Sequence, residues 1–349
     1  PFLIRPLGGL FFGALGDKYG RQKVLAATIV IMSLSTFAIG LIPGYDTIGI
    51  WAPILLLLCK MAQGFSVGGE YTGASIFVAE YAPDRKRGFL GSWLDFGSIA
   101  GFVLGAGVVV LISSILGEEQ FESWGWRLPF IASFVLILIS MYVQLKLEDT
   151  PAFKALAANQ APKDTAQQTV VKSPIVEVLR RYPKRIVLAA GAFLSIQVTF
   201  YILIAFVVAY GVNSPTVTLS RDMMLTAVLV AAAIMVPSQF YFSGLSDRLG
   251  RKTVYRWGAI LTGLWGFALF PLIDTGQPVL ICFAVTMGLV FLGMQYGPQA
   301  AFFTELFSTE VRYSGASLGY QLGAIVGGAL APTIAVLLWN NFGIFWVSV

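Results

Sequence analysis

Residues 60–107 read KMAQGFSVGGEYTGASIFVAEYAPDRKRGFLGSWLDFGSIAGFVLGAG, and this stretch decides the fold. Two long apolar runs flank the short cationic turn DRKR at 84–87, which predicts two membrane helices joined by a tight loop. The runs nevertheless contain Lys60, Glu70 and Asp95. A charge inside hydrocarbon is costly, so an ionisable residue within a membrane helix marks a candidate functional site. We expect these helices to line a polar passage.

The composition of the whole chain is that of an α-helical membrane protein. Of its 349 residues, 57% are hydrophobic and 12% are charged, whereas soluble globular proteins have about 25% charged residues. Apolar runs long enough to span a bilayer cover residues 24–42, 50–82, 88–116, 128–145, 186–212, 223–242, 253–273, 279–307 and 313–338. There is no His, nucleophile motif or cluster of metal ligands, so we expect no enzyme activity, cofactor or metal.

The basic residues predict the topology and the domains. All but four of the 23 Lys and Arg residues fall in alternate loops, which the positive-inside rule places in the cytoplasm. The net charge of +5 therefore reflects topology, and we expect no nucleic-acid partner. The longest polar stretch divides the chain, so we predict an N-terminal helix bundle over 1–145, a cytoplasmic linker over 146–184 and a C-terminal bundle over 185–349.

The two halves of the sequence are related. The segment DKYGRQK at 17–23 corresponds to DRLGRK at 247–252, and Glu80, seven residues before Arg87, corresponds to Glu305, seven before Arg312. Such long-period similarity predicts two related bundles with the site at their interface. The terminal apolar runs are too short to span, so we expect a first helix before residue 1 and most of a twelfth after residue 349. The N-terminal bundle would then hold helices 2–6, and the C-terminal bundle helices 7–11 with the start of 12.

The segments GALGDKYGRQK at 13–23 and SGLSDRLGRK at 243–252 resemble the loop signature of the major facilitator superfamily. The first copy departs in the position of its last basic residue, and the second has Ser243 where Gly is usual. Residues 68–107, WGWRLPF at 124–130 and LEDTPAF at 147–153 resemble the metabolite–proton symporters of that superfamily. The first half is similar to their proline and glycine-betaine members. The second half, with residues 297–323, is more similar to the shikimate and dicarboxylate carriers.

This resemblance implies a gate at the cytoplasmic side. Asp17 would face the start of a helix from the opposite half, where the positive end of the helix dipole favours a carboxylate. Arg21 would pair with Glu80, and Arg251 with Glu305. With the related position in the second loop, the candidate gate residues are Asp17, Arg21, Glu80, Asp247, Arg251 and Glu305. The alternative is that they are solvated charges, since isolated exposed ion pairs contribute little.

Polar residues within apolar runs are the candidates for proton or substrate coupling, and they are Arg5, Lys60, Gln63, Glu70 and Asp95. Gln63 and Glu70 are seven residues apart and share a helix face. Asp95 points away from a stripe formed by Gly97, Gly101 and Gly105, which we expect to pack on a neighbouring helix, as does the stripe at 315–327. The alternative for Glu70 is an ion pair with Lys60 or Arg5. Arg5 would bind a solute carboxylate or pair with an acid.

Further aromatic and polar side chains on apolar helices are candidates for the substrate pocket. They are Tyr71, Trp93, Phe96, Gln197, Tyr201, Gln295, Tyr296 and Gln299. Aromatic faces attract quaternary ammonium ions, which would suit betaine. The alternative is that these residues serve packing and interhelical hydrogen bonds.

Together, the residues and the resemblance predict a secondary active transporter. It would be a proton-coupled symporter that takes up a small organic solute such as proline or glycine betaine across the bacterial cytoplasmic membrane by alternating access, as a monomer. A carboxylate such as shikimate, 2-oxoglutarate or a citrate-like metabolite is the alternative solute. Proton-antiport efflux ranks lower, because residues 97–107 have glycines but no proline. A sensor without transport would not need the buried charges, and no Walker A motif indicates ATP as the driving force.

Overall fold

The computed structural model describes residues 3–150, 174–214 and 219–348, and these residues contain helices and loops without any strand. Nine helices in this part of the chain are long and apolar enough to cross a membrane. They are Arg21–Leu41, Trp51–Tyr81, Asp84–Leu116, Phe121–Gln144, Pro183–Asn213, Arg221–Leu249, Arg251–Asp274, Pro278–Glu305 and Arg312–Phe342. The predicted all-α membrane protein is confirmed.

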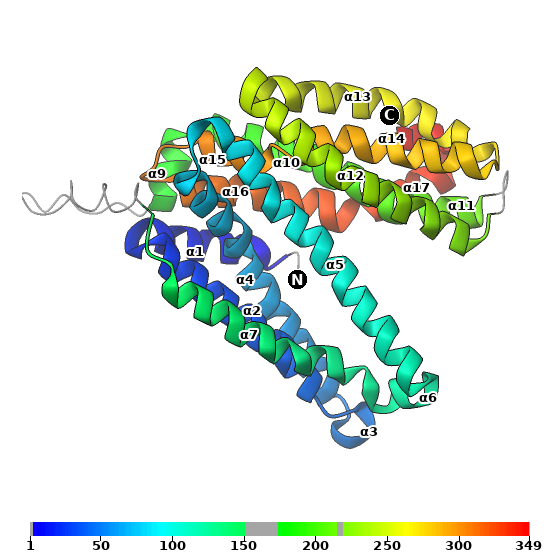
Figure 1. Ribbon diagram of the computed structural model, residues 1–349, viewed down its shortest axis with the longest axis horizontal. Coiled ribbons are helices and arrows are strands. Elements are labelled where there is room, and N and C mark those ends of the chain that lie inside the picture. Colours follow the sequence, from blue (N-terminus) through cyan, green and yellow to red (C-terminus); the bar gives the residue numbers. More distant parts are fainter. Residues whose placement is uncertain (1–2, 151–173, 215–218, 349) are drawn as a thin grey trace, which may run out of the picture. The chain divides into compact units, whose positions relative to one another are not determined.

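Contacts divide the chain into two compact units, and unit 1 comprises Pro1–Tyr81, Phe96–Pro183 and Phe307–Gln321. Helix α2 packs against both α4 and α7, and α1 packs against α4 (Figure 1). The helices of this unit are α1 (Arg5–Tyr19), α2 (Arg21–Leu41), α3 (Tyr45–Ile48), α4 (Trp51–Tyr81), α6 (Glu118–Gln120), η2 (Phe121–Gly125), α7 (Arg127–Lys146) and α9 (Pro174–Arg181). Most of the predicted linker, residues 151–173, lies outside the described residues.

Glycines allow α1 and α4 to approach each other closely. A Cβ added to Gly8 would lie 1.8 Å from the carbonyl oxygen of Phe65, and one added to Gly68 would lie 2.1 Å from that of Arg5. Any larger residue at either position would therefore separate the two backbones. Small residues permit this kind of close helix contact within a membrane.

Unit 2 comprises Ala82–Asp95, Lys184–Leu306 and Leu322–Val349. Helix α14 packs between α12 and α13, as Figure 1 shows. Its helices are η1 (Asp84–Lys86), α10 (Pro183–Tyr201), η3 (Ile202–Phe206), α11 (Val207–Asn213), α12 (Arg221–Leu249), α13 (Arg251–Asp274), α14 (Pro278–Tyr296), α15 (Gln299–Glu305), η4 (Ile325–Leu330), α17 (Ala331–Phe342) and α18 (Phe345–Ser348). Pro298 has no N–H to donate, and the span that contains α14 and α15 breaks there.

Besides α10, whose first residue Pro183 falls in unit 1, two helices contribute residues to both units, namely α5 (Arg87–Leu116) and α16 (Arg312–Ala324). The contact division thus differs from the predicted domain boundaries, because 82–95 group with the second half of the sequence and 307–321 with the first. The boundaries at 145 and 185 remain a prediction.

The expected packing of the glycine stripe on α5 is wrong. A Cβ added to Gly97, Gly101 or Gly105 would meet no atom of the structure within 4 Å. A glycine of the second stripe, on α16, does lie in close contact, because a Cβ on Gly315 would be 2.4 Å from the Phe307 ring. Spacing alone identifies small residues on one face of a helix but does not show that a neighbour covers that face.

Candidate functional site

Asp17, in the last turn of α1, caps the start of α16 within unit 1. Its Oδ1 accepts a hydrogen bond from the backbone N–H of Tyr313 at 3.2 Å. Its Oδ2 accepts from the N–H and the hydroxyl of Ser314, both at 2.9 Å. Asp17 therefore faces the start of a helix from the second half of the sequence, as the resemblance implied. Asp17 lies outside the nine membrane-length helices of the described chain. Burial raises the pKa of its carboxyl to about 6, against the opposing effect of the Ser314 hydrogen bonds and the Arg21 charge.

Glu80, near the end of α4, joins two arginines. Its Oε2 lies 2.9 Å from Nη1 of Arg21, and its Oε1 lies 2.7 Å from Nη1 of Arg312. The side chains of Arg21 and Glu80 are 1% and 2% exposed. Water and salt therefore weaken the attraction in this ion pair far less than in a surface pair. Arg21 also donates to the backbone carbonyl of Thr309 at 2.8 Å. The expected Arg21–Glu80 pair is thus present, and Arg312 extends it.

Sequence reasoning missed two residues that complete this network, Asp149 and Thr150. The backbone N–H of Gln22, at the start of α2, donates to Oδ1 of Asp149 at 2.8 Å. The Thr150 hydroxyl donates to Oε2 of Glu80 at 2.5 Å. Both residues belong to the LEDTPAF segment that carried part of the resemblance. Their partners lie 127 and 70 residues away in sequence, and no local pattern indicates them.

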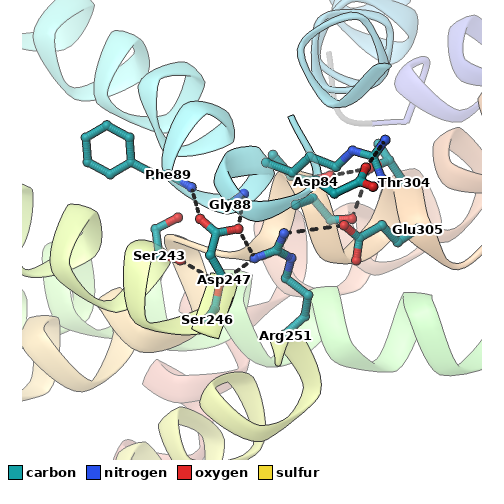
Figure 2. Close-up of polar contacts among 12 residues, drawn as sticks. Asp84, Gly88, Phe89, Ser243, Ser246, Asp247, Arg251, Thr304 and Glu305 are labelled. Atoms are coloured by element: carbon teal, nitrogen blue, oxygen red, sulfur yellow. Dashed lines mark hydrogen bonds and ion pairs between the residues drawn. The ribbon is translucent and has the colours of Figure 1, made fainter. Parts of the chain in front are cut away.

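A related arrangement exists in unit 2, and Figure 2 shows it. Asp247 accepts hydrogen bonds from the backbone N–H groups of Gly88 at 2.9 Å and Phe89 at 3.0 Å, at the start of α5. Arg251 pairs with Asp247, and its Nη2 lies 3.4 Å from Oε1 of Glu305. The expected Arg251–Glu305 pair is therefore present. Glu305 is 38% exposed, so this second pair is longer and wetter than Arg21–Glu80.

Glu70, on α4 in unit 1, is a partly buried acid without an ion pair among the described residues. Its Oε2 has neither exposed surface nor a hydrogen-bond partner there. The alternative interpretation, an ion pair of Glu70 with Lys60 or Arg5, is not realised in the part of the chain that the structure describes. Gln63 donates instead to Oγ1 of Thr36 at 2.7 Å, which links α4 to α2.

Asp95 belongs to a polar cluster in unit 2. The Nε2 of Gln299 donates to its Oδ1 at 2.9 Å, and both side chains are fully buried. Tyr296 and Tyr201 lie close enough to interact electrostatically, Tyr296 with both Asp95 and Tyr201. Four candidates from three separate stretches of sequence therefore meet at one place.

The remaining polar candidates of unit 2 serve interhelical contacts. The Oε1 of Gln295 accepts from the Ser195 hydroxyl at 3.2 Å, and its Nε2 donates to Oγ1 of Thr262 at 3.1 Å. Gln197 packs against Gly327, where an added Cβ would lie 2.6 Å from that of Gln197. For Gln295 and Gln197, the described contacts are those of the packing alternative.

The aromatic candidates are distributed over the two units. In unit 2, Trp93 lies edge-on to Phe240 with ring centroids 5.1 Å apart. In unit 1, Tyr71 stacks on Tyr320 with centroids 4.6 Å apart. Phe96 also belongs to unit 1. Of the three candidates, Trp93 shares a unit with Asp95, and an aromatic cage around a solute remains a prediction.

Residues 1–349 match the model of the family described as "Sugar (and other) transporter". The proline/betaine transporter of Escherichia coli strain K12 is 50% identical over 342 residues, which cover 97% of this chain and 67% of that protein. The chain belongs to the major facilitator superfamily. The shikimate transporter of E. coli K12 is 36% identical to this transporter over 356 residues, covering 100% of the chain and 78% of that protein.

A solved structure agrees with the fold of the transporter. The proton:xylose symporter XylE, bound to 6-bromo-6-deoxy-D-glucose, aligns with a TM-score of 0.77 at 16% identity. The alignment covers 99% of this chain and 81% of XylE. Together with the family match, these comparisons confirm the predicted superfamily and make the protein a multi-pass transporter of the bacterial inner membrane rather than an enzyme.

Proposed function

We propose that this transporter takes up proline, glycine betaine or a similar small zwitterion by proton symport and alternating access. The observation that carries the proposal is the 50% identity to a proline/betaine transporter along 97% of the chain. The shikimate transporter is less similar, at 36%. A zwitterionic solute therefore ranks above a carboxylate.

Glu70 is the proposed proton carrier. A buried carboxylate without a cation is neutralised at low cost by a proton, whereas its ionised form is strongly disfavoured away from water. Glu70 has no ion pair among the described residues and one oxygen without a hydrogen-bond partner, so the proton has no competing cation there. Glu70 would bind a proton when the site opens to the outside, and it would release that proton when the site opens to the cytoplasm.

Asp95 is the proposed partner for the ammonium group of the solute. Gln299 orients one oxygen of its carboxylate, and Tyr296 and Tyr201 add hydroxyl groups nearby. Trp93, two residues before Asp95 and 53% exposed, supplies an aromatic face that would attract a quaternary ammonium ion. Arg5 and Lys60 are the candidates for the solute carboxylate.

The test is uptake into proteoliposomes of proline, glycine betaine, shikimate and 2-oxoglutarate, with and without an inward proton gradient. We expect gradient-dependent accumulation of proline or betaine and none of the two carboxylates. Glu70→Gln should abolish the gradient dependence, whereas the control Glu122→Gln, at an exposed acid, should not. Gradient-driven uptake of shikimate alone would identify the carboxylate alternative. Accumulation that ignores the gradient would refute proton symport.

A further inference from the structure

Two side chains of α16 bind the backbone immediately before Glu70. The hydroxyl of Tyr313 donates to the carbonyl oxygen of Gly69 at 2.8 Å. The Nε2 of Gln321 donates to the carbonyl oxygen of Gly68 at 3.0 Å. Gly68 and Gly69 directly precede Glu70, so α16 holds the turn of α4 from which this acid projects.

Tyr313 reaches α4 because glycines leave room for its ring. A Cβ on Gly16 would lie 1.8 Å from the Tyr313 ring, and one on Gly73 would lie 2.3 Å from its hydroxyl. The Tyr313 side chain is fully buried, and its backbone N–H is the group that Asp17 caps. One residue therefore connects the gate carboxylate of α1 with the turn that carries Glu70.

The α16 side of this contact is incompletely satisfied among the described residues. Oε1 of Gln321 and Oγ of Ser317 are buried without hydrogen-bond partners, as is Oε2 of Glu70. Gln321 and Ser317 both lie against Gly9, at 3.0 and 3.5 Å from an added Cβ. A buried polar atom without a hydrogen-bond partner costs free energy. The docked arrangement of α16 therefore combines its favourable bonds to Gly68 and Gly69 with the unfavourable burial of these three oxygens.

No cation among the described residues pairs with Glu70. The titratable or charged side chains on the helices packed against α4 are Arg5, Asp17, Lys18 and Tyr19 of α1, Arg21 and Lys23 of α2, Tyr45 and Asp46 of α3, and Arg312, Tyr313 and Tyr320 of α16. Among these described residues, none forms an ion pair with Glu70.

We propose that Tyr313 and Gln321 are positioning residues that link the docking of α16 to the protonation of Glu70, an inference that rests on the proposed role of Glu70 as proton carrier. With α16 docked, the two bonds fix the Gly68–Gly69 turn and keep water from Oε2 of Glu70, which favours the protonated acid. When α16 leaves, the two carbonyls and Glu70 become hydrated, the ionised form is favoured, and the proton passes to water. The undocking of α16 and proton release thus become one event.

The experiment measures the pH dependence of solute binding by the purified transporter, with radiolabelled proline as the probe. Tyr313→Phe removes only the hydroxyl, and Gln321→Leu removes only the amide. Because partial hydration of a buried acid moves its titration by about one pH unit, each variant should shift the midpoint of the pH profile to lower pH by about that amount. In a Glu70→Gln background, neither variant should shift the profile further.

Tyr255→Phe is the matched control. Its hydroxyl also donates to a backbone carbonyl, that of Ala192 at 2.6 Å, but in unit 2. It should lower thermal stability as much as Tyr313→Phe does while leaving the pH midpoint unchanged. If Glu70→Gln abolishes the pH dependence but neither α16 variant shifts its midpoint, this inference is overturned while the proposed role of Glu70 stands. A profile that survives Glu70→Gln would overturn the proposed function as well. Where a variant is too unstable to purify, the pH profile of uptake in whole cells replaces the binding measurement and decides in the same way.

Discussion

Replacing Glu80 by Gln tests whether the buried ion pairs of unit 1 hold α16 in place. The substitution keeps the size of the side chain and one acceptor oxygen but removes the charge that lies 2.9 Å from Arg21 and 2.7 Å from Arg312. Removing one partner of a buried pair costs about 3–5 kcal/mol. Since the substituted amide could still accept one hydrogen bond, the lower value of about 3 kcal/mol applies, and this corresponds to an about hundredfold larger population with α16 undocked.

The assay is the rate at which a maleimide applied from the cytoplasmic side labels a cysteine at position 316. Ala316, on α16, is 2% exposed, so labelling requires undocking. Cys59 and Cys282 are replaced by Ser in this background, because both are partly exposed. We expect Glu80→Gln to raise the labelling rate by about two orders of magnitude, and the exposed control Glu122→Gln to leave it unchanged. A rate within about twofold of the parent protein would refute the stabilising role of this ion pair.

Three further predictions concern the two gate carboxylates and their partners. Asp17→Lys should abolish uptake while the protein still inserts, because lysine cannot accept the three hydrogen bonds from Tyr313 and Ser314; normal uptake would contradict the capping role. The pKa of Asp17 is raised from 3.8 to about 6 in the packed state, so that state binds the extra proton. Labelling at position 316, relative to that of free cysteine at the same pH, should therefore slow as the pH falls from about 7 to about 5. In a Glu70→Gln background, Asp17→Asn should remove this dependence, and a slope that persists in the double variant would assign it to another group. Glu305→Gln should cost less than about 1 kcal/mol, because Glu305 is 38% exposed and its pair with Arg251 is long. If Glu305→Gln lowers thermal stability as much as Glu80→Gln does, solvent exposure does not determine how much these ion pairs contribute.

The sequence predicted the membrane helices because burial in lipid leaves a strong signal, namely long apolar runs with basic residues in alternate loops. It also predicted that Asp17 faces the start of a helix from the other half, and it predicted the pairs of Arg21 and Arg251. Both followed because the loop signature occurs twice and the resemblance supplied the relation between the copies. These predictions needed no knowledge of how individual helices pack.

The rest depended on neighbours that periodicity does not identify. Gly97, Gly101 and Gly105 share one face of α5, yet an added Cβ there meets nothing within 4 Å, whereas Gly8 of α1 lies against a close helix. Gln63 shares a helical face with Glu70, but its amide bonds to Thr36. Asp149 contacts the start of α2 from 127 residues away, so its role follows from tertiary structure alone.

The two helix caps have a consequence for how the chain can be divided. Asp17 and the first turn of α16 belong to unit 1, and Asp247 and the first turn of α5 belong to unit 2, so each unit is assembled from both halves of the sequence. Cleavage between residues 146 and 184 would therefore yield two fragments, each lacking a segment that the other supplies. Expressed separately, such fragments should not fold stably on their own. They should recover function only when both are produced in the same membrane.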